Sequence, residues 1–185
     1  MGKTVELNTP ITTEELMKLE IGDKVLITGT IYTARDAAHK RLVALLAEGK
    51  ELPFNPKGAV IYYVGPAPAP PGKAIGSAGP TTSYRMDPYA PALMDAGLKA
   101  MIGKGPRGKS VVESMVKNKA VYLAAIGGAA VVVASAIKKA EVIAYEDLGP
   151  EAVRKLEVVK FPCILANDIH GNDIFQEGVK QYKKD

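Results

Sequence analysis

The hexapeptide AVIYYV, residues Ala59 to Val64, decides the fold class of this chain. It is a continuous apolar run of strand length, rich in β-branched and aromatic residues. A strand without polar alternation is typical of a sheet that is covered on both faces, as in α/β proteins. The loop Pro66 to Gly72 follows it, and its prolines cannot enter a helix or the interior of a sheet. This loop is predicted either as a stiff surface connection or as an arm that faces a partner or borders a site.

The segments before this strand show clear helix and strand patterns. Thr12 and Glu15 stand at capping-box spacing and predict the start of a short helix. A strand rich in β-branched residues is predicted over Lys24 to Tyr32. The apolar spacing that follows predicts a helix over Arg35 to Glu48, with Gly49 as its C-terminal stop.

The segments after this strand continue the alternation. A short helix is expected after Thr82. Further on, the patterns predict strands at Leu98 to Ile102, Val121 to Ala124 and Val142 to Tyr145, and helices at Lys109 to Lys117 and Ala129 to Lys139. A helix near Pro150 to Leu156 and strands around Val158 and Ile164 complete the core. This alternation predicts an α/β fold: one domain, residues 1–185, built on a largely parallel central sheet.

The uncharged stretch from Ala120 to Ile137 reaches the length at which a membrane-spanning helix becomes a candidate. The pair Gly127-Gly128 divides it, however, and Val121 to Leu123 has the pattern of a strand. The part from Ala129 to Ile137 is apolar on every face, as in a buried helix. We therefore predict a strand, a glycine turn and a buried helix, and no membrane partner.

Composition excludes several classes of protein. Of the 185 residues 47% are hydrophobic and 24% charged, which is typical of a globular protein and argues against extensive disorder. The net charge is +4, but cations are not interleaved with aromatic residues, so no nucleic-acid partner is predicted. Cys163 is the single cysteine, which excludes a disulfide framework and an all-cysteine metal site within the chain. This cysteine usage, and an N-terminus without an apolar signal region, predict a cytoplasmic protein.

Three predicted strand-to-helix junctions carry a glycine-rich turn or a cation: Thr33 to Asp36, Gly79 to Arg85 and Gly103 to Ser110. Such junctions expose backbone N–H groups at the positive end of a helix dipole and therefore attract anions. Arg35 and Arg85 have the planar fork that binds a carboxylate through two parallel hydrogen bonds, and Lys104 adds a point charge. Together the three cations favour a dicarboxylate ligand over unrelated surface positions.

The third junction also matches the phosphate-binding loop G-x-x-x-x-G-K-[ST], through Gly103, Gly108, Lys109 and Ser110. By itself this match would indicate a nucleotide-binding protein. Such a loop usually follows the first core strand, however, whereas at least two predicted strands precede this one. A magnesium-binding Asp directly after an apolar strand is also not evident. A P-loop nucleotide-binding protein is therefore the more remote alternative.

Histidine and cysteine suggest little chemistry. His39 aligns with Leu42 on the predicted helix and is expected at the boundary of the core rather than as a ligand. His170 lies in a turn-rich segment without a recognisable set of metal ligands. Cys163, in an apolar strand, is expected to be a buried small hydrophobe. No metal site is predicted within this chain.

Three motifs resemble one known family: TGTIYTARDAAHKR (Thr28 to Arg41), GPTTSYRMD (Gly79 to Asp87) and IGKG (Ile102 to Gly105). They are similar to the β subunit, or C-terminal domain, of class I fumarases and L-tartrate dehydratases, from about Leu7 to Phe175. The resemblance implies a domain of the swivelling β/β/α type. It also implies hydro-lyase activity, the reversible hydration of fumarate to malate.

By motif position, the resemblance implies roles for particular residues. Arg35, Arg85 and Lys104 match the family's carboxylate-binding cations, and Lys104 is also expected to serve catalysis. Thr81 matches the proposed general base, with Thr82 beside it as a substrate-binding residue. Fixed cations would stabilise the negative charge that develops when a proton leaves the carbon next to a carboxylate. A threonine hydroxyl is a weak base unless a nearby cation stabilises its alkoxide.

The resemblance further implies a cofactor and a partner. In the family, three cysteines of the other half of the enzyme hold a [4Fe–4S] cluster. Because this chain has Cys163 alone, we expect a separate α subunit to hold the cluster and the active form to be a hetero-oligomer. One local departure is Ala34, where many members have Gly before the Arg-Asp pair. This change should alter the turn slightly without removing Arg35.

The substrate stays open between fumarate and tartrate, since the two activities differ by one substrate hydroxyl. The residues around GSAGPTTSYRMD, Gly76 to Asp87, favour fumarate. The alternative is an L-tartrate dehydratase β subunit. A noncatalytic binding module would leave the clustered cations unexplained.

Overall fold

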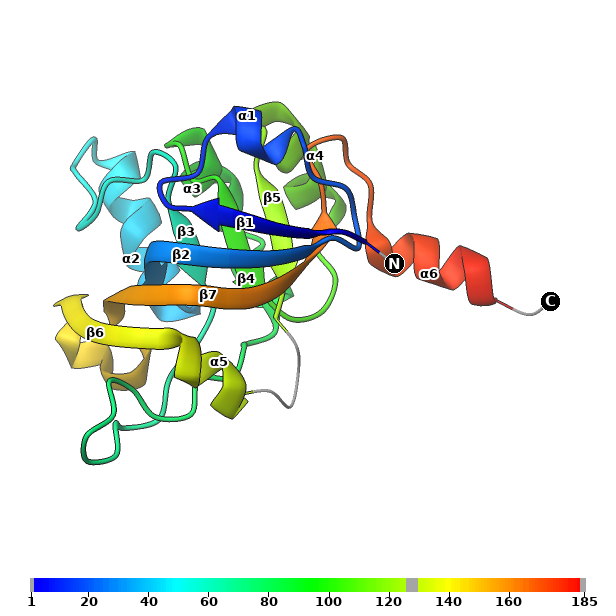
Figure 1. Cartoon of the computed structure of the whole chain (residues 1–185). Helices are drawn as coiled ribbons and strands as arrows, with labels where there is room; N and C mark the ends of the chain where they lie inside the picture. Colours follow the sequence, from blue (N-terminus) through cyan, green and yellow to red (C-terminus); the bar gives the residue numbers. More distant parts are fainter. Residues whose placement is uncertain (1, 126–129, 184–185) are drawn as a thin grey trace.

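In the computed structural model, which describes residues 2–125 and 130–183, the chain forms a sheet in the order β1-β2-β3-β4-β5-β7-β6. Among these residues the seven strands are β1 (Thr4–Asn8), β2 (Lys24–Thr33), β3 (Val60–Tyr62), β4 (Ala100–Gly103), β5 (Val121–Ala124), β6 (Ile137–Ala144) and β7 (Val153–Asn167). β2 also pairs with β7. The strands β2, β3, β4, β5 and β7 therefore close into a barrel-like ring, with β1 and β6 attached outside it (Figure 1).

The strand directions do not confirm the prediction of a largely parallel sheet, because the sheet is mixed. Strands β1 to β5 each run parallel to the next in the sheet. In contrast, β7 runs antiparallel to β2, β5 and β6. The physical reason is the connection from β6 to β7: a short 3₁₀ turn, η2 (Glu146–Glu151), replaces a crossover helix. Antiparallel neighbours need no crossover, whereas parallel ones do.

Strand β3 separates two hydrophobic cores. Val60, Tyr62 and Val64 point into the core inside the barrel, and Ile61 and Tyr63 belong to the outer core. All five are fully buried. Successive side chains of a strand point to opposite faces, so these residues pack alternately into the two cores. The prediction of a strand buried on both faces is therefore confirmed.

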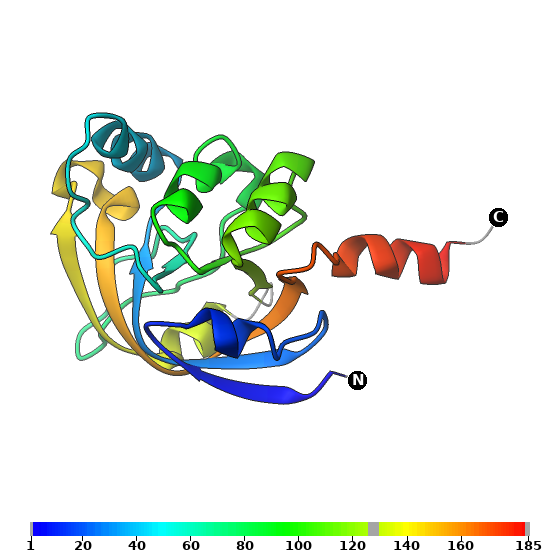
Figure 2. The ribbon, with the colours of Figure 1, turned by 90° about the horizontal axis from the view of Figure 1, so that it is seen from above.

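The outer core is covered by three helices that Figure 2 shows together on one side of the sheet: α2 (Asp36–Ala47), α3 (Ala90–Asp95) and α4 (Lys109–Asn118). The short helix α1 (Thr13–Leu16) instead contributes Leu16 to the barrel interior. Its predicted capping box is present. The Glu15 amide donates to Thr12 Oγ1 at 3.3 Å, and the Thr12 amide donates to Glu15 Oε2 at 2.8 Å.

The predicted helix from Ala129 to Lys139 is wrong at its C-terminal end. Helix α5 (Ala130–Ala136) stops at Ala136, and β6 begins at Ile137. The helix is also not buried on every face, because Val131 is 77% exposed and Val132 60% exposed. Ala129 and the predicted Gly127-Gly128 turn lie outside the described residues. Over residues 2–125 and 130–183, no helix is long and apolar enough to cross a membrane.

The predicted helix from Pro150 to Leu156 is wrong. The turn η2 ends at Glu151, and β7 continues from Val153 through the positions of both predicted strands, Val158 and Ile164. Two further elements are absent from the prediction: strand β1 at the edge of the sheet and helix α6 (Ile174–Tyr182). Figure 1 shows α6 projecting away from the barrel.

Candidate functional site

The parallel strands bring the first and third predicted junctions to one edge of the sheet, and the bridges Val64–Pro80 and Thr82–Lys104 hold the second junction there. Thr33 at the end of β2 is paired with Tyr62 of β3, and Tyr62 with Ile102 of β4. The residues that follow these strands therefore leave the sheet side by side. In open α/β sheets, ligands bind at the carboxyl ends of the strands. The cations predicted from sequence thus stand where an α/β fold usually places a ligand.

The turn that carries Thr81 is hydrogen-bonded directly to Lys104. The Thr81 amide donates to the Tyr63 carbonyl at 2.7 Å, and the Lys104 amide donates to the Thr81 carbonyl at 3.3 Å. The Ser83 amide completes the pairing by donating to the Lys104 carbonyl at 2.9 Å. Thr81 and Thr82 are half-buried, whereas Lys104 is exposed. The second and third junctions therefore form one continuous site rather than two separate turns.

Arg85 joins this site to the first junction. It lies in the 3₁₀ turn η1 (Ser83–Met86), and its Nη2 donates to Oδ2 of Asp36 at 2.8 Å. Asp36 is the first residue of α2 and follows Arg35 directly. The Arg85 side chain stays 41% exposed, so part of its guanidinium faces solvent. Solvent-facing donors on a guanidinium held at one side are suited to bind a carboxylate.

Arg35 takes a more constrained position than the sequence predicts. It is the residue before the first turn of α2, and its Nη2 lies 3.3 Å from Oε1 of Glu151. Its guanidinium lies across Gly65, where an added Cβ would be 2.6 Å from Nη1. Arg35 Nε is buried and has no hydrogen-bond partner among the described residues. A substrate carboxylate would therefore share Arg35 with Glu151.

The geometry of the third junction argues against a phosphate-binding loop. The Gly108 amide, at the start of α4, donates to Oδ2 of Asp87 at 2.7 Å. A carboxylate of the same chain thus occupies a donor that a phosphate would need. The Lys109 side chain is 91% exposed and lies 3.8 Å from Glu113, one turn along the same helix. The third junction therefore matches the P-loop sequence, but its Gly108 amide and its Lys109 side chain are not arranged to bind a phosphate.

The sequence predicts His39 at the boundary of the core, but in the structure it is fully buried in the outer core. Its Nδ1 is 2.9 Å from the Arg35 carbonyl, so it supports the backbone at the start of α2. Burial lowers the pKa of His39 from its ordinary value to about 4, although the hydrogen bond to the Arg35 carbonyl acts in the opposite direction. The imidazole is therefore neutral near neutral pH.

Cys163 is buried in β7, as predicted, and burial raises the pKa of its thiol.

His170 lies in a turn that a carboxylate stabilises. The Asp168 carboxylate accepts hydrogen bonds from the His170 and Asn172 amides at 2.9 and 3.0 Å. In the described part of the chain, no three His, Cys, Asp or Glu side chains gather in a way that could hold a metal ion.

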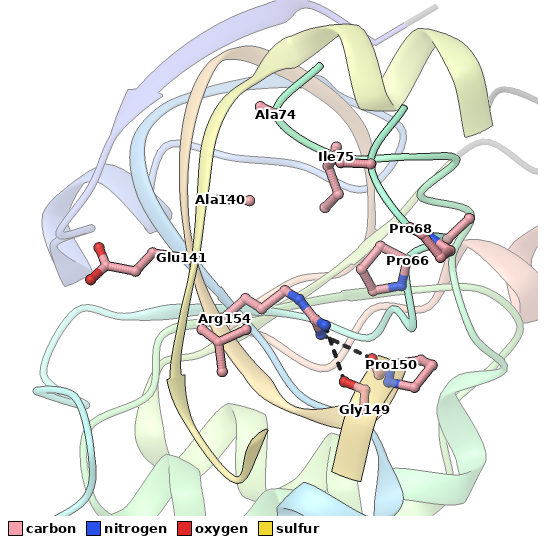
Figure 3. Close-up of a pocket in the computed structure, with 12 residues that line it drawn as sticks. Pro66, Pro68, Ala74, Ile75, Ala140, Glu141, Gly149, Pro150 and Arg154 are labelled. Carbon is pink, nitrogen blue, oxygen red and sulfur yellow. Dashed lines mark hydrogen bonds between the residues drawn. The ribbon is translucent and has the colours of Figure 1, made fainter. Parts of the chain in front are cut away.

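The proline-rich loop borders a cavity of about 360 Å³ (Figure 3). Pro66 and Pro68 form one wall, and Arg154 reaches into the cavity from β7. The Arg154 guanidinium donates to the carbonyls of Gly149 and Pro150 at 3.0 and 3.1 Å. Its donors therefore stabilise the turn η2 and do not converge on a ligand position.

Sequence reasoning missed four charged residues that shape the site, of which Glu151, the partner of Arg35, lies outside all the quoted motifs. Asp36 and Asp87 lie inside the quoted motifs, but nothing in the motifs shows that they bind cations of the same chain. Arg107 lies in the third junction, and its side chain is entirely buried. Its position between two glycines of an apparently exposed loop gave no signal of burial.

The fold and the site define an α/β protein with a partly closed barrel and a cationic site at the carboxyl ends of its parallel strands. The chain belongs to the family described as Fumarase C-terminus, whose model matches residues 1–178. It is 43% identical to fumarate hydratase 1, mitochondrial, of Leishmania major over 94% of this chain and 32% of that protein. It is 42% identical to the anaerobic class I fumarate hydratase of Escherichia coli K12, over 96% of this chain and 33% of that protein.

The chain thus spans about a third of the length of these two relatives. A relative from Methanocaldococcus jannaschii has a similar length to this chain. It is 38% identical over 94% of this chain and 93% of that protein, and its provisional name is L(+)-tartrate dehydratase subunit beta.

Proposed function

We propose that this chain is the β-type subunit of a class I fumarase-like hydro-lyase that hydrates fumarate reversibly to malate. The observation that carries the proposal is the pairing of the Thr81-Thr82 turn with Lys104, with Arg85 in the 3₁₀ turn that follows directly. The family membership and the similarity to fumarate hydratases support the same activity. In this proposal residues 1–185 form one domain of the swivelling β/β/α type.

The proposed chemistry assigns a separate task to each side chain. Arg85 binds one substrate carboxylate through its solvent-facing donors, and Asp36 holds the opposite side of its guanidinium. Arg35, shared with Glu151, and Lys104 supply further positive charge, and Thr82 contributes a polar contact. In the direction from malate to fumarate, the Thr81 alkoxide accepts a proton from the carbon next to a carboxylate. The hydroxyl group of the neighbouring carbon leaves with its bonding electrons, and together with the proton that Thr81 then releases it makes up the water product. Lys104 stabilises the threonine alkoxide before the transfer and the negative charge that develops on the substrate carboxylate during it.

The residues of this chain do not fit a [4Fe–4S] cluster. Such clusters are held by several Cys thiolates, whereas Cys163 is the single cysteine and is fully buried in β7. Burial disfavours the thiolate that ligation requires. In the proposal the cluster therefore belongs to a separate α subunit, and the active form is a hetero-oligomer in the reducing cytoplasm.

Two comparisons support this division between chains. The Methanocaldococcus jannaschii relative is named as a subunit beta and has a similar length to this chain. The matched region covers only about a third of each fumarate hydratase, so the rest of those chains has room for a cluster-binding part.

An L-tartrate dehydratase β subunit is the second candidate, and the name of the Methanocaldococcus jannaschii relative favours it. The two candidates share the carboxylate-binding cations and differ in the substrate hydroxyl groups. Co-expression with the neighbouring reading frame, followed by anaerobic purification, allows both substrates to be assayed. We expect a higher kcat/KM for fumarate than for L-tartrate. The reverse order would establish the second candidate, and no turnover of either substrate would contradict the proposal.

A further inference from the structure

Arg107 is a buried cation next to the proposed site. It lies in the loop between Lys104 and α4, and its side chain is 0% exposed. Its Nε donates to Oδ1 of Asp87 at 2.7 Å, while the Gly108 amide donates to the other carboxylate oxygen at 2.7 Å. Asp87 follows the last residue of η1. One carboxylate at the end of η1 therefore holds two consecutive residues of the loop that carries Lys104.

Two tyrosine rings complete the surroundings of Arg107. Its guanidinium carbon lies 5.4 Å from the ring centroid of Tyr63 and 5.1 Å from that of Tyr122. Contacts of this length between a guanidinium and an aromatic ring are attractive, more so when water is excluded. Nη1 also lies 3.5 Å from Tyr63 Oη, at the limit of a hydrogen bond. The backbone carbonyl of Tyr63 accepts the hydrogen bond from Thr81, so the same residue contacts both Arg107 and the Thr81 turn.

Tyr122 links the other side of this arrangement. Its hydroxyl donates to the Gly105 carbonyl at 3.0 Å and lies 2.8 Å from Ser83 Oγ. Burial raises the pKa of Tyr122, so its hydroxyl keeps the proton that it donates. Ser83 in turn packs so closely on Gly103 that a Cβ at this glycine would collide with Ser83 Oγ. Contacts with η1 and Asp87 thus hold both ends of the segment from Gly103 to Gly108, which contains Lys104.

We propose that Arg107 is a positioning residue, which fixes the Lys104 loop against the turn that carries Thr81 and Arg85. The inference rests on the proposed function and adds to it a residue that does not touch the substrate. Burying a cation is costly unless it is paired, and here its partner Asp87 lies in the segment whose position matters. Without Arg107, the Asp87 carboxylate loses a partner and the loop loses its charged anchor. Lys104 then no longer stands at a fixed distance from Thr81.

A purely structural role for Arg107 makes a different prediction. If Arg107 served stability alone, its loss would reduce the folded fraction, which lowers the apparent kcat and leaves KM unchanged. A displaced Lys104 instead weakens the binding of a substrate carboxylate and therefore raises KM. A charge-assisted hydrogen bond contributes enough that we expect KM to rise roughly ten-fold or more. The kcat should fall as well, because displacing a reacting group by about 1 Å costs up to about a hundred-fold in rate.

The test uses Arg107→Met, Arg107→Lys and the control Arg154→Met, which removes a partly buried guanidinium that holds a different turn. Hydrogen exchange on the full chain follows the Ser83, Lys104 and Gly108 amides, whose hydrogen bonds connect the loop to η1. We expect exchange of these amides to accelerate at least about ten-fold in Arg107→Met. Arg107→Lys, which keeps the charge, should restore part of the protection. Arg154→Met should leave these amides unchanged.

The same variants are then assayed in the complex with the cluster-bearing chain. Arg107→Met should show the rise in KM, and Arg107→Lys a smaller one. If Arg107→Met does not fold, Arg107→Lys and Asp87→Asn decide the question with the same two measurements. Unchanged exchange at the three amides together with an unchanged KM would overturn the inference and leave the proposed function intact. A wild-type complex that turns over neither substrate would overturn the proposed function, while the exchange data alone would still decide whether Arg107 fixes the loop.

Discussion

Asp36 and Arg85, 49 positions apart in the sequence, are joined by a hydrogen bond of 2.8 Å between Oδ2 and Nη2. The contact connects the start of α2 with η1, and therefore the first predicted junction with the second. It places Asp36, the residue after Arg35, beside Arg85, which we expect to bind a substrate carboxylate. Asp36 thus determines which side of the Arg85 guanidinium remains available.

Asp36→Asn should weaken the orientation of Arg85 without removing any positive charge from the site. The pair is partly exposed, and pairs of this kind contribute up to about 1 kcal/mol, so we expect kcat/KM to fall roughly two- to five-fold. Asp147→Asn is the control. Asp147 pairs with Arg41, which lies on α2 like Asp36 but outside the proposed site. An unchanged kcat/KM in Asp36→Asn would show that Asp36 does not orient Arg85.

Arg85→Lys should impair the reconstituted enzyme although it keeps the charge, because Lys lacks the planar fork that binds both carboxylate oxygens. Losing a charge-assisted hydrogen bond predicts a fall of roughly ten- to a hundred-fold in kcat/KM. Arg41→Lys changes an equally exposed arginine of α2 and should have no effect on the rate. A near-normal rate for Arg85→Lys would place Arg85 outside the substrate-binding site.

Lys104 and Lys109 distinguish the hydro-lyase from the nucleotide-binding alternative. Lys104→Ala should abolish fumarate turnover, because it removes the cation of the loop whose backbone is hydrogen-bonded to the Thr81 turn. Lys109→Ala should leave turnover largely intact, since this side chain is exposed on α4. Titration of the chain with magnesium–ATP should show no saturable binding at micromolar concentration. Tight ATP binding that depends on Lys109 and not on Lys104 would contradict the account.

His39 should make the folded state less stable in mild acid. Its pKa is about 4 in the folded chain and 6.5 when unperturbed, so the unfolded state binds a proton first as the pH falls. The stabilisation is complete above about pH 6.5, decreases between pH 6.5 and about pH 4, and amounts to roughly 3 kcal/mol. Urea unfolding of the wild type and of His39→Gln across this range measures the difference. An equal pH dependence in both proteins would show that His39 is not held neutral by burial.

Much of the fold could be predicted because local patterns agree with the tertiary structure. The strand from Val121 to Ala124 has the predicted ends, and the helix predicted over Arg35 to Glu48 is one residue shorter at each end. The apolar strand at Ala59 to Val64 lies between two cores, as its lack of polar residues indicates. In each of these segments, the order of apolar and polar residues in the sequence matches the burial of their side chains in the structure.

The elements that were missed depend on distant partners. A strand was predicted only over Val142 to Tyr145, whereas β6 already begins at Ile137. The missed first part has exposed charges such as Lys138 and Glu141, and its place in the sheet comes from pairing with β7 rather than from its own pattern. Pro150 suggested a helix start, but the turn there feeds directly into β7, which is fixed by its pairing with β2. Edge strands with charged residues carry weak strand signals because they must avoid pairing with other molecules.

The candidate site was predictable to a similar extent. Parallel strands end at a common edge, so the junctions with Arg35 and Lys104 could be expected to lie near each other, whereas the turn with Thr81 reaches them through bridges to Val64 and Lys104. The pairing of Arg35 with Glu151 could not, because Glu151 comes from the turn η2, far along the chain. Burial of Arg107 between Tyr63 and Tyr122 likewise depends on strands that the loop sequence does not reveal.

The most direct test of the central claim compares fumarate hydration by the pure chain with hydration by the complex with its cysteine-bearing partner, both prepared anaerobically. A cubane cluster needs several thiolates, and Cys163 is single and buried, so the pure chain should be colourless and inactive. The complex should hydrate fumarate. Robust fumarate hydration by the pure chain alone, or an inactive complex that holds an intact cluster, would contradict the account.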